Sequence, residues 1–168
     1  TLATSNTGTT YIGNTGYAYN NDIEYGGDGL AEIDVKGGNL IVNGQIRRNP
    51  ATSAGVLKYS QSAGTVTING QSAITTNAKL EVLNYGSAFN MSGGTLNIIR
   101  GGGGTVYGDL YLRPETSSVT GGTIVLSNST LSGSAQTYRL DANIPLYNLT
   151  ITGRTAATAA NAQVDLMV

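Results

Sequence analysis

The sequence contains no cysteine, no histidine and no tryptophan among its 168 residues. Without cysteine the chain has neither disulfides nor a thiol nucleophile, and without cysteine or histidine it lacks the usual zinc ligands. The absence of histidine also excludes the serine–histidine triad and imidazole proton transfer. Any chemistry must therefore use carboxylates, Tyr, Lys or Arg.

Charge is scarce as well, since charged residues make up 11 % of the chain and the formal net charge is -1. The chain thus lacks the basic field of a nucleic-acid binder and the charge of a typical disordered tail. It also has no run of 18 apolar residues that could cross a membrane as a helix. We expect no cofactor, no nucleic-acid partner and no insertion into a membrane.

Gly, Thr, Asn and Ser are abundant and together supply 75 of the 168 residues. This composition leaves little room for helix-forming residues, so an all-helical fold is excluded. The length predicts one domain with its own core. The first residues, Thr1–Ser5, include no methionine and no leader-like pattern. We interpret the chain as a portion of a longer, exported, extracellular protein.

A short motif recurs along the chain, with one or two glycines followed by Thr or Asn and an alternating apolar pattern. The residues after the glycines are Asn39, Thr65, Thr95 and Thr123, so the spacings are 26, 30 and 28 residues. A repeat of about 28 residues divides the chain into about six units. Such a period is typical of solenoids.

Each motif alternates with period two, which predicts a strand with one buried face. Leu40, Val66, Leu96 and Ile124 are expected to stack inward as one column, and the Thr and Asn residues outward as another. The glycines before each strand predict corners where the backbone needs a positive φ or passes close to a neighbouring coil. The expected structural corners are Gly37, Gly38, Gly64, Gly93, Gly94, Gly121 and Gly122.

The sequence therefore predicts an all-β fold, a parallel β-solenoid of about six coils of about 28 residues, expected to be a right-handed β-helix. Residues 1–168 form a single segment, less regular over 1–29 and repeat-like over 30–168. Pro50 and Pro114 predict turns between strands. An antiparallel β-sandwich is the alternative, because its short strands also recur between turns.

The segments Gly93–Ile98 and Asn143–Gly153 resemble the β-helical stretches of very large surface proteins of Bacteroidota. Those proteins are exported by the type IX secretion system, and some act as cell-surface adhesins in gliding motility. The resemblance implies a structural role as a stalk or adhesive fibre. It also implies flanking domains of the same polypeptide and the export machinery as partners.

Half of the ten acidic residues lie within 13 positions, at Asp22, Glu24, Asp28, Glu32 and Asp34. Carboxylates two apart on a strand are about 7 Å from each other, within the range used by inverting glycosidases. The oxygen-rich stretch containing Asp22, Glu24 and Asp28 is also a weak calcium candidate. We favour a solvated acidic edge, because no apolar surroundings raise the pKa of an acid here.

Two further patterns are compatible with binding of surface glycans. Arg47, Arg48, Lys58 and Lys79 lie in a stretch without acids, which is suited to an acidic polysaccharide. Tyrosines could stack on sugar rings, among them Tyr11, Tyr17, Tyr19, Tyr25, Tyr107 and Tyr111, although packing on strand faces is their commoner use. We predict a non-enzymatic structural or adhesive segment, with a carbohydrate-binding or polysaccharide-degrading β-helix as the alternative.

Overall fold

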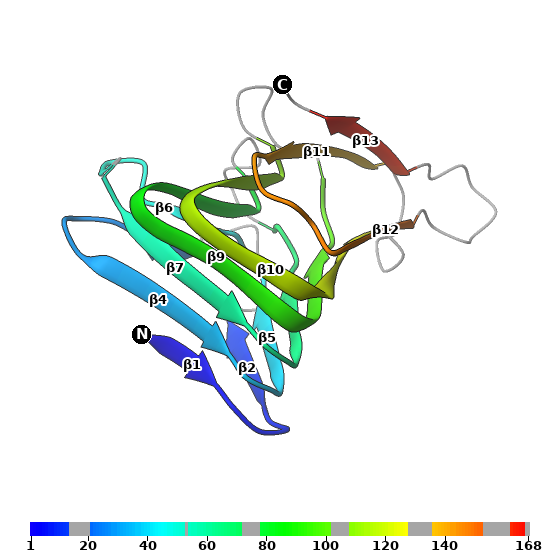
Figure 1. The fold of residues 1–168 in the computed structure, drawn as a ribbon, viewed down its shortest axis with the longest axis horizontal. Coiled ribbons are helices and arrows are strands. Elements are labelled where there is room, and N and C mark those ends of the chain that lie inside the picture. Colours follow the sequence, from blue (N-terminus) through cyan, green and yellow to red (C-terminus); the bar gives the residue numbers. More distant parts are fainter. Residues whose placement is uncertain are drawn as a thin grey trace.

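The computed structural model describes residues 1–13, 21–52, 54–71, 78–101, 108–127, 136–152 and 162–166. Within these ranges the chain forms thirteen strands in one sheet and no helix (Figure 1). The strands are β1 (Leu2–Thr4), β2 (Thr9–Ile12), β3 (Ile23–Tyr25), β4 (Leu30–Val35), β5 (Asn39–Val42), β6 (Ile46–Arg48), β7 (Val56–Gln61), β8 (Thr65–Ile68), β9 (Leu80–Ile98), β10 (Leu110–Ser127), β11 (Gln136–Ala142), β12 (Asn148–Thr152) and β13 (Ala162–Leu166).

Every pairing between these strands is parallel, so the predicted β-solenoid is confirmed and the antiparallel sandwich is wrong. The strands form three faces. The first face contains β1, β4, β7 and the middle parts of β9 and β10, which lie side by side in Figure 1. The second face contains β2, β5, β8, β12 and the ends of β9 and β10. The third face contains β3, β6, β11, β13 and the beginnings of β9 and β10.

The coil count differs from the prediction, since the solenoid forms about four turns and not six. The difference arises at the ends of the stack. We call one turn of the solenoid, which contributes a strand to each face, a level. The first level contains β1, β2 and β3, which are only three or four residues long. The last level has no strand on the first face, because the chain passes from β11 to β12 directly. The predicted number of coils was obtained by dividing the chain length by the repeat length, and this division treats the incomplete levels as full coils.

The predicted inward column is confirmed on the second face. Leu40 pairs with Val66, Val66 with Leu96, and Leu96 with Ile124, and all four side chains are buried. The outward column of Asn39, Thr65, Thr95 and Thr123 follows the same register. Because parallel strands in register place identical positions about 4.8 Å apart, each core residue packs on its equivalents above and below.

The glycines of the motif lie at the corners between the first and second faces, where β9 and β10 bend without ending. Gly94 has a φ of 77°, and a Cβ there would lie 2.6 Å from the carbonyl oxygen of Gly64 in the preceding level. Both the left-handed backbone and the lack of space therefore require glycine. Positive φ recurs at Gly38, Gly64 and Gly122, and a Cβ at Gly37, Gly93 or Gly121 would meet a carbonyl oxygen of the preceding level within 3.0 Å.

Of the three prolines in the chain, the two that predict turns behave differently. Pro50 lies in the turn after β6, as predicted. Pro114 was expected to end a strand, but β10 continues through it and bends there, with a register shift between Pro114 and Thr116. A proline is tolerated at such an irregularity because its missing N–H removes no regular ladder bond. In β10 the third and first faces are therefore joined by a bend in a continuous strand, whereas β3 and β4, like β6 and β7, are joined by turns.

Candidate functional site

The acidic cluster does not gather at one place. Asp22 and Glu24 both accept hydrogen bonds from Arg47, with 2.9 Å between Arg47 Nε and Asp22 Oδ2 and a second contact from Nη2 to Glu24 Oε1. Asp22 Oδ1 also accepts the backbone N–H of Gln45 at 2.7 Å. The Asp22 side chain is 1 % exposed, so it is not part of a solvated edge.

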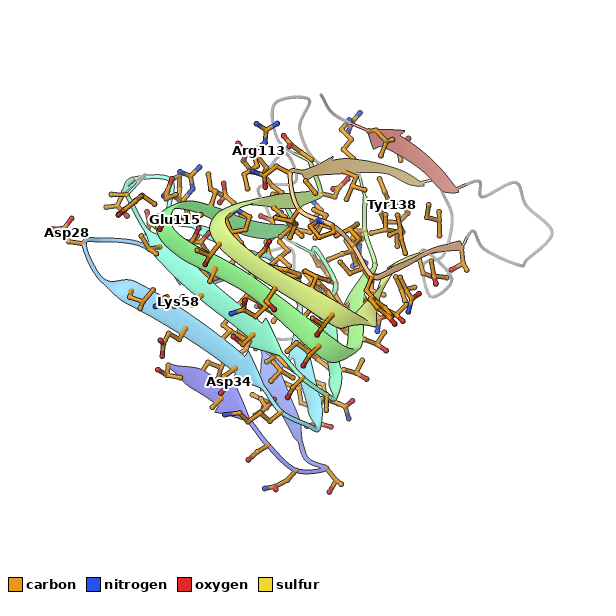
Figure 2. The ribbon with its side chains drawn as sticks, viewed as in Figure 1. Asp28, Asp34, Lys58, Arg113, Glu115 and Tyr138 are labelled. Carbon is orange, nitrogen blue, oxygen red and sulfur yellow. The ribbon has the colours of Figure 1, made fainter. Side chains whose placement is uncertain are left out.

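The other three acids lie elsewhere. Glu32 accepts a hydrogen bond from the Thr1 hydroxyl at 2.8 Å, and Asp34 pairs with Lys36 at 2.6 Å. Asp28 is exposed at the turn between β3 and β4 (Figure 2). Among the described residues, no three His, Cys, Asp or Glu side chains gather closely enough to hold a metal ion. The contacts of Asp22 and Glu24 favour Arg47 as their partner over a calcium ion.

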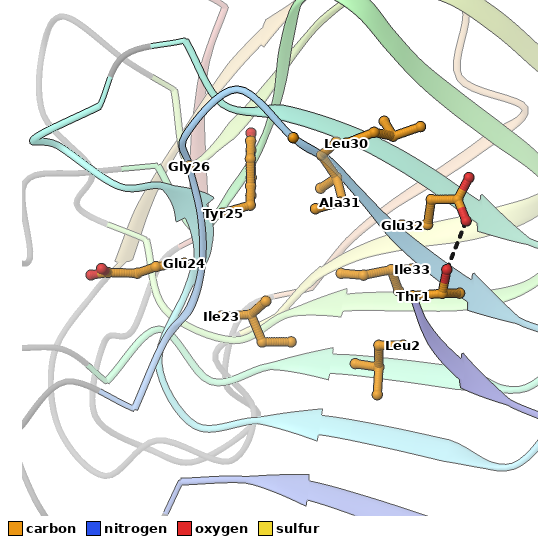
Figure 3. Close-up of a pocket in the computed structure, with 12 residues that line it drawn as sticks. Thr1, Leu2, Ile23, Glu24, Tyr25, Gly26, Leu30, Ala31, Glu32 and Ile33 are labelled. Atoms are coloured by element: carbon orange, nitrogen blue, oxygen red, sulfur yellow. Dashed lines mark hydrogen bonds between the residues drawn. The ribbon is translucent and has the colours of Figure 1, made fainter.

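Two of the acids line a cavity of about 450 Å³ at the first level of the stack (Figure 3). Its walls include the apolar side chains of Leu2, Ile33 and Leu57, which continue the core. The carboxylates of Glu24 and Glu32 point away from each other in Figure 3. The cavity is thus the interior of the first level, without the facing carboxylates that hydrolysis of a glycosidic bond requires.

Charged side chains are concentrated on the third face, which we call the ion-pair face. Besides the contacts of Arg47, Arg48 Nη2 lies 3.0 Å from Glu81 Oε1, Lys79 Nζ lies 4.0 Å from Asp109 Oδ1, and Arg113 Nε lies 2.6 Å from Asp141 Oδ1. The hydrogen bond to Asp141 raises the pKa of Arg113. These residues lie on β3, β6, β9, β10 and β11 or directly before them.

The ion-pair face follows a pattern that the sequence reasoning missed. Five of its strands place one apolar residue, buried in every case except Ile23, between two polar residues: Asp22-Ile23-Glu24, Gln45-Ile46-Arg47, Lys79-Leu80-Glu81, Asp109-Leu110-Tyr111 and Arg139-Leu140-Asp141. Stacked in register, no two like charges are direct neighbours in either polar column. Because like charges directly opposite each other are destabilising, this alternation favours the observed register. The recurring triplet was the available signal.

The basic residues do not form the expected strip. Arg47, Arg48 and Lys79 take part in the ion-pair face, whereas Lys58 lies on the first face and is exposed (Figure 2). A side chain that is buried against a carboxylate cannot also grip an acidic polysaccharide. Only Lys58 of the four therefore points freely to solvent.

The tyrosines are similarly dispersed. Tyr25 is buried and donates its hydroxyl to the carbonyl oxygen of Glu81 at 2.6 Å, and burial raises its pKa. Tyr111 is half-buried, and burial also raises its pKa. The strongly exposed tyrosines are on β2, at the bend within β9 and before β12: Tyr11, Tyr85 and Tyr147. Tyr17, Tyr19 and Tyr107 lie outside the described residues.

Two adjoining hollows lie on the first face. One has a volume of about 440 Å³ and the other of about 300 Å³, and they share Asp34, Lys36, Ser60 and Asn90. Asp34 and Lys58 lie on the near side of the sheet in Figure 2, on β4 and β7. The shared lining combines short polar side chains with one ion pair, so it offers both hydrogen-bond donors and acceptors.

No protein family, no curated protein and no solved structure matches this chain. The described ranges contain no helix with the length and apolar character needed to span a membrane.

Proposed function

We propose that this chain is a non-enzymatic structural segment, a stalk or adhesive fibre, of a large exported cell-surface protein. The observation that carries the proposal is the continuous parallel stack, in which strands of the inner levels pair with a level on either side. Such a stack transmits its order from one level to the next and can be extended by adding coils. It suits a protein that must hold a distance between a cell and another surface.

The arrangement of charge supports the same proposal. In the ion-pair face, the side chains that could otherwise perform acid–base chemistry or bind an acidic polymer are paired with each other, among them Asp22, Glu24 and Arg47. In this proposal the protein acts outside the cell, and its partners are the flanking domains of its own polypeptide, with the export machinery acting during secretion.

A polysaccharide-depolymerisation assay tests the non-enzymatic part of the proposal. The purified chain is incubated with a panel of neutral and acidic polysaccharides, and new reducing ends are measured. We expect no release above buffer. Release by the wild-type chain that is lost in a variant carrying Glu24→Gln and Glu32→Gln would contradict the proposal, because these two acids line the cavity of the first level.

Single-molecule pulling tests the structural part. The chain is placed between two reference domains of known unfolding force and stretched from its ends. We expect levels to be lost in discrete steps, because each level is held by the strands of its neighbours. Extension at near-zero force without steps would be incompatible with a stalk.

Carbohydrate binding is a second candidate function, favoured by the adjoining hollows on the first face. Ser60 lies in both hollows, so Ser60→Trp is expected to fill them and abolish binding. Thr67→Trp, at an outward position of β8 on the second face, is the matched control. Calorimetry with acidic and neutral oligosaccharides measures the effect. If calorimetry detects no heat of binding for either the wild-type chain or the Thr67→Trp control, the hollows are not a glycan site.

A further inference from the structure

Lys79 and Asp109 form the most deeply buried ion pair among the described residues, with side chains 1 % and 0 % exposed. They occupy equivalent positions in adjacent levels, directly before β9 and β10. Lys79 Nζ lies 4.0 Å from Asp109 Oδ1. This separation exceeds the roughly 2.8 Å of a charge-assisted hydrogen bond. Because Oδ1 is bonded directly to Cγ, the Lys79 amine lies near the carbon that it would attack.

The backbone holds both side chains in place. The N–H of Lys79 donates to the carbonyl oxygen of Asp109 at 2.7 Å, which fixes the register of the two residues. The stem of Lys79 passes over Gly70, where a Cβ would lie 2.9 Å from Lys79 Cδ. The second carboxylate oxygen of Asp109, Oδ2, accepts the backbone N–H of Arg139 at 2.8 Å. One oxygen of Asp109 therefore faces Lys79 and the other faces a fixed donor.

The surroundings make it easier for the Lys79 ammonium to lose its proton. Burial lowers the pKa of Lys79 most strongly, and the nearby Arg100 lowers it further, while Asp109 and Asp22 act in the opposite direction. Only the neutral amine has the lone pair needed for nucleophilic attack. The hydroxyl of Tyr138 donates a hydrogen bond to the carbonyl oxygen of Ile99. Burial raises the pKa of Tyr138, and the negative charge of the nearby Asp109 raises it further.

We propose that the side chains of Lys79 and Asp109 condense into an isopeptide bond. A proton passes from the Lys79 ammonium to Oδ1 of Asp109, and Nζ attacks Cγ. The Arg139 N–H stabilises the negative charge that develops on Oδ2, as an oxyanion-hole donor does. Nζ then gives its second proton to the Oδ1 hydroxyl, the Cγ–Oδ1 bond breaks, and Oδ1 leaves as water while the carbonyl re-forms at Oδ2. An ammonium and a carboxylate thus yield one amide and one water, with no oxidant, reductant or co-reactant.

Two physical arguments make this condensation favourable here. It removes two charges from a dry environment, where each carries a desolvation penalty. The fixed geometry also replaces a bimolecular encounter, which gives intramolecular reactions their high effective concentrations. The product ties two adjacent levels covalently in a chain that has no cysteine for disulfides. This inference stands on Lys79 and Asp109 alone and does not depend on the proposed function.

Mass spectrometry of the denatured 168-residue chain tests the proposal. We expect an intact mass that is one water lower than the sequence mass. After tryptic digestion, Lys79 should resist cleavage, and peptide 59–100 should be recovered joined to peptide 101–139, because trypsin does not cut between Arg113 and Pro114. Recovery of the full sequence mass, with normal cleavage after Lys79, would overturn the proposal.

Variants identify the source of the lost water. Lys79→Arg should have its full calculated mass, whereas the control Lys58→Arg, at an exposed position, should remain one water lower. A succinimide at Asp28-Gly29 also loses one water, but it would persist in Lys79→Arg and map to a different peptide, and that result would contradict the proposal. If Lys79→Arg fails to fold, the branched peptide from the wild-type chain decides the question.

Discussion

Arg47 is the largest side chain that the structure buries almost completely among the described residues. A guanidinium can be buried only if its charge and donors are compensated, and Asp22 and Glu24 provide this compensation. A third contact, to the carbonyl oxygen of Arg48, is longer at 3.4 Å. Arg47 thus holds together the two acids that the sequence alone suggested as a calcium or catalytic pair.

Arg47→Ala is expected to lower the free energy of unfolding by about 3 kcal/mol or more, because it leaves Asp22 buried without its cationic partner. Urea denaturation followed by circular dichroism measures the change. Lys58→Ala is the matched control, since Lys58 is exposed, and it should change stability by less than about 0.5 kcal/mol. Equal effects of the two substitutions would show that the Arg47 contacts contribute little.

The burial of Tyr59 makes the stability of the fold depend on pH in the alkaline range. Its side chain is fully buried, its hydroxyl donates to Gln61 Oε1 at 2.7 Å, and its ring stacks on Phe89 at 5.2 Å between centroids. Burial raises the pKa of Tyr59. The unfolded chain therefore loses this proton at a lower pH than the folded chain does.

The contribution of Tyr59 to stability is fully present below the pKa of an unfolded tyrosine, about 10, and is lost as the pH rises above it. Tyr59→Phe should reduce the decline of unfolding free energy by up to about 1.4 kcal/mol per pH unit in the alkaline range. Denaturation series at several pH values above about 10 measure this slope. Tyr85→Phe, at an exposed position, should decline as steeply as the wild-type chain. Parallel slopes for all three proteins would contradict the expectation.

At the scale of the elements, the corner between the first and second faces requires glycine for two separate reasons. Gly94 needs a left-handed backbone and also space against the carbonyl oxygen of Gly64. Gly27 has a φ of 74° but nothing within 4 Å of an added Cβ, so it shares only the first demand. Gly29 has neither. The three glycines can therefore separate backbone strain from crowding.

Gly94→Ala is expected to destabilise the chain by about 3 kcal/mol, Gly27→Ala by about 1 kcal/mol, and Gly29→Ala by close to zero. The order follows from adding a carbonyl clash to the strain of a positive φ. Thermal and urea unfolding of the three variants measure it. A Gly94→Ala protein as stable as Gly29→Ala would mean that neighbouring levels can move apart at this turn.

The second-face strands could be predicted because their signals are local. Glycine at a turn and alternation of residues such as Leu96 and Ile98 can be recognised within one short segment. The third-face strands were missed, although the polar–apolar–polar triplet recurs in them, because β6 is only three residues long and its partners are 23 to 34 positions away. Whether Glu24 faces water or Arg47 depends on the register between levels, which no local pattern contains. The acidic cluster therefore looked like an exposed edge.

At the scale of the whole molecule, burial changes along the stack. On the second face the inward residues Ile124 and Leu126 are 2 % and 1 % exposed, whereas Leu149 and Ile151, their equivalents in β12, are 38 % and 44 % exposed. At the other end, β2 pairs only with β5 among the described strands. Levels in the middle are stabilised from two sides, and the outermost levels from one.

This difference predicts a gradient of hydrogen exchange in the 168-residue chain. Backbone amides of β8 and of the paired parts of β9 should exchange at least about tenfold more slowly than those of β2 and β12. The reason is that opening a central level breaks contacts with two neighbouring levels, whereas opening an end level breaks contacts with one. Exchange at neutral pH, followed by peptide mass spectrometry, resolves these segments.

Leu149→Ala, in an end level, should accelerate exchange mainly in β12, whereas Leu96→Ala should accelerate it on both sides of the substitution, in β8 and β10. Uniform protection along the stack, or uniform acceleration by both substitutions, would show that the solenoid opens as one cooperative unit and not level by level.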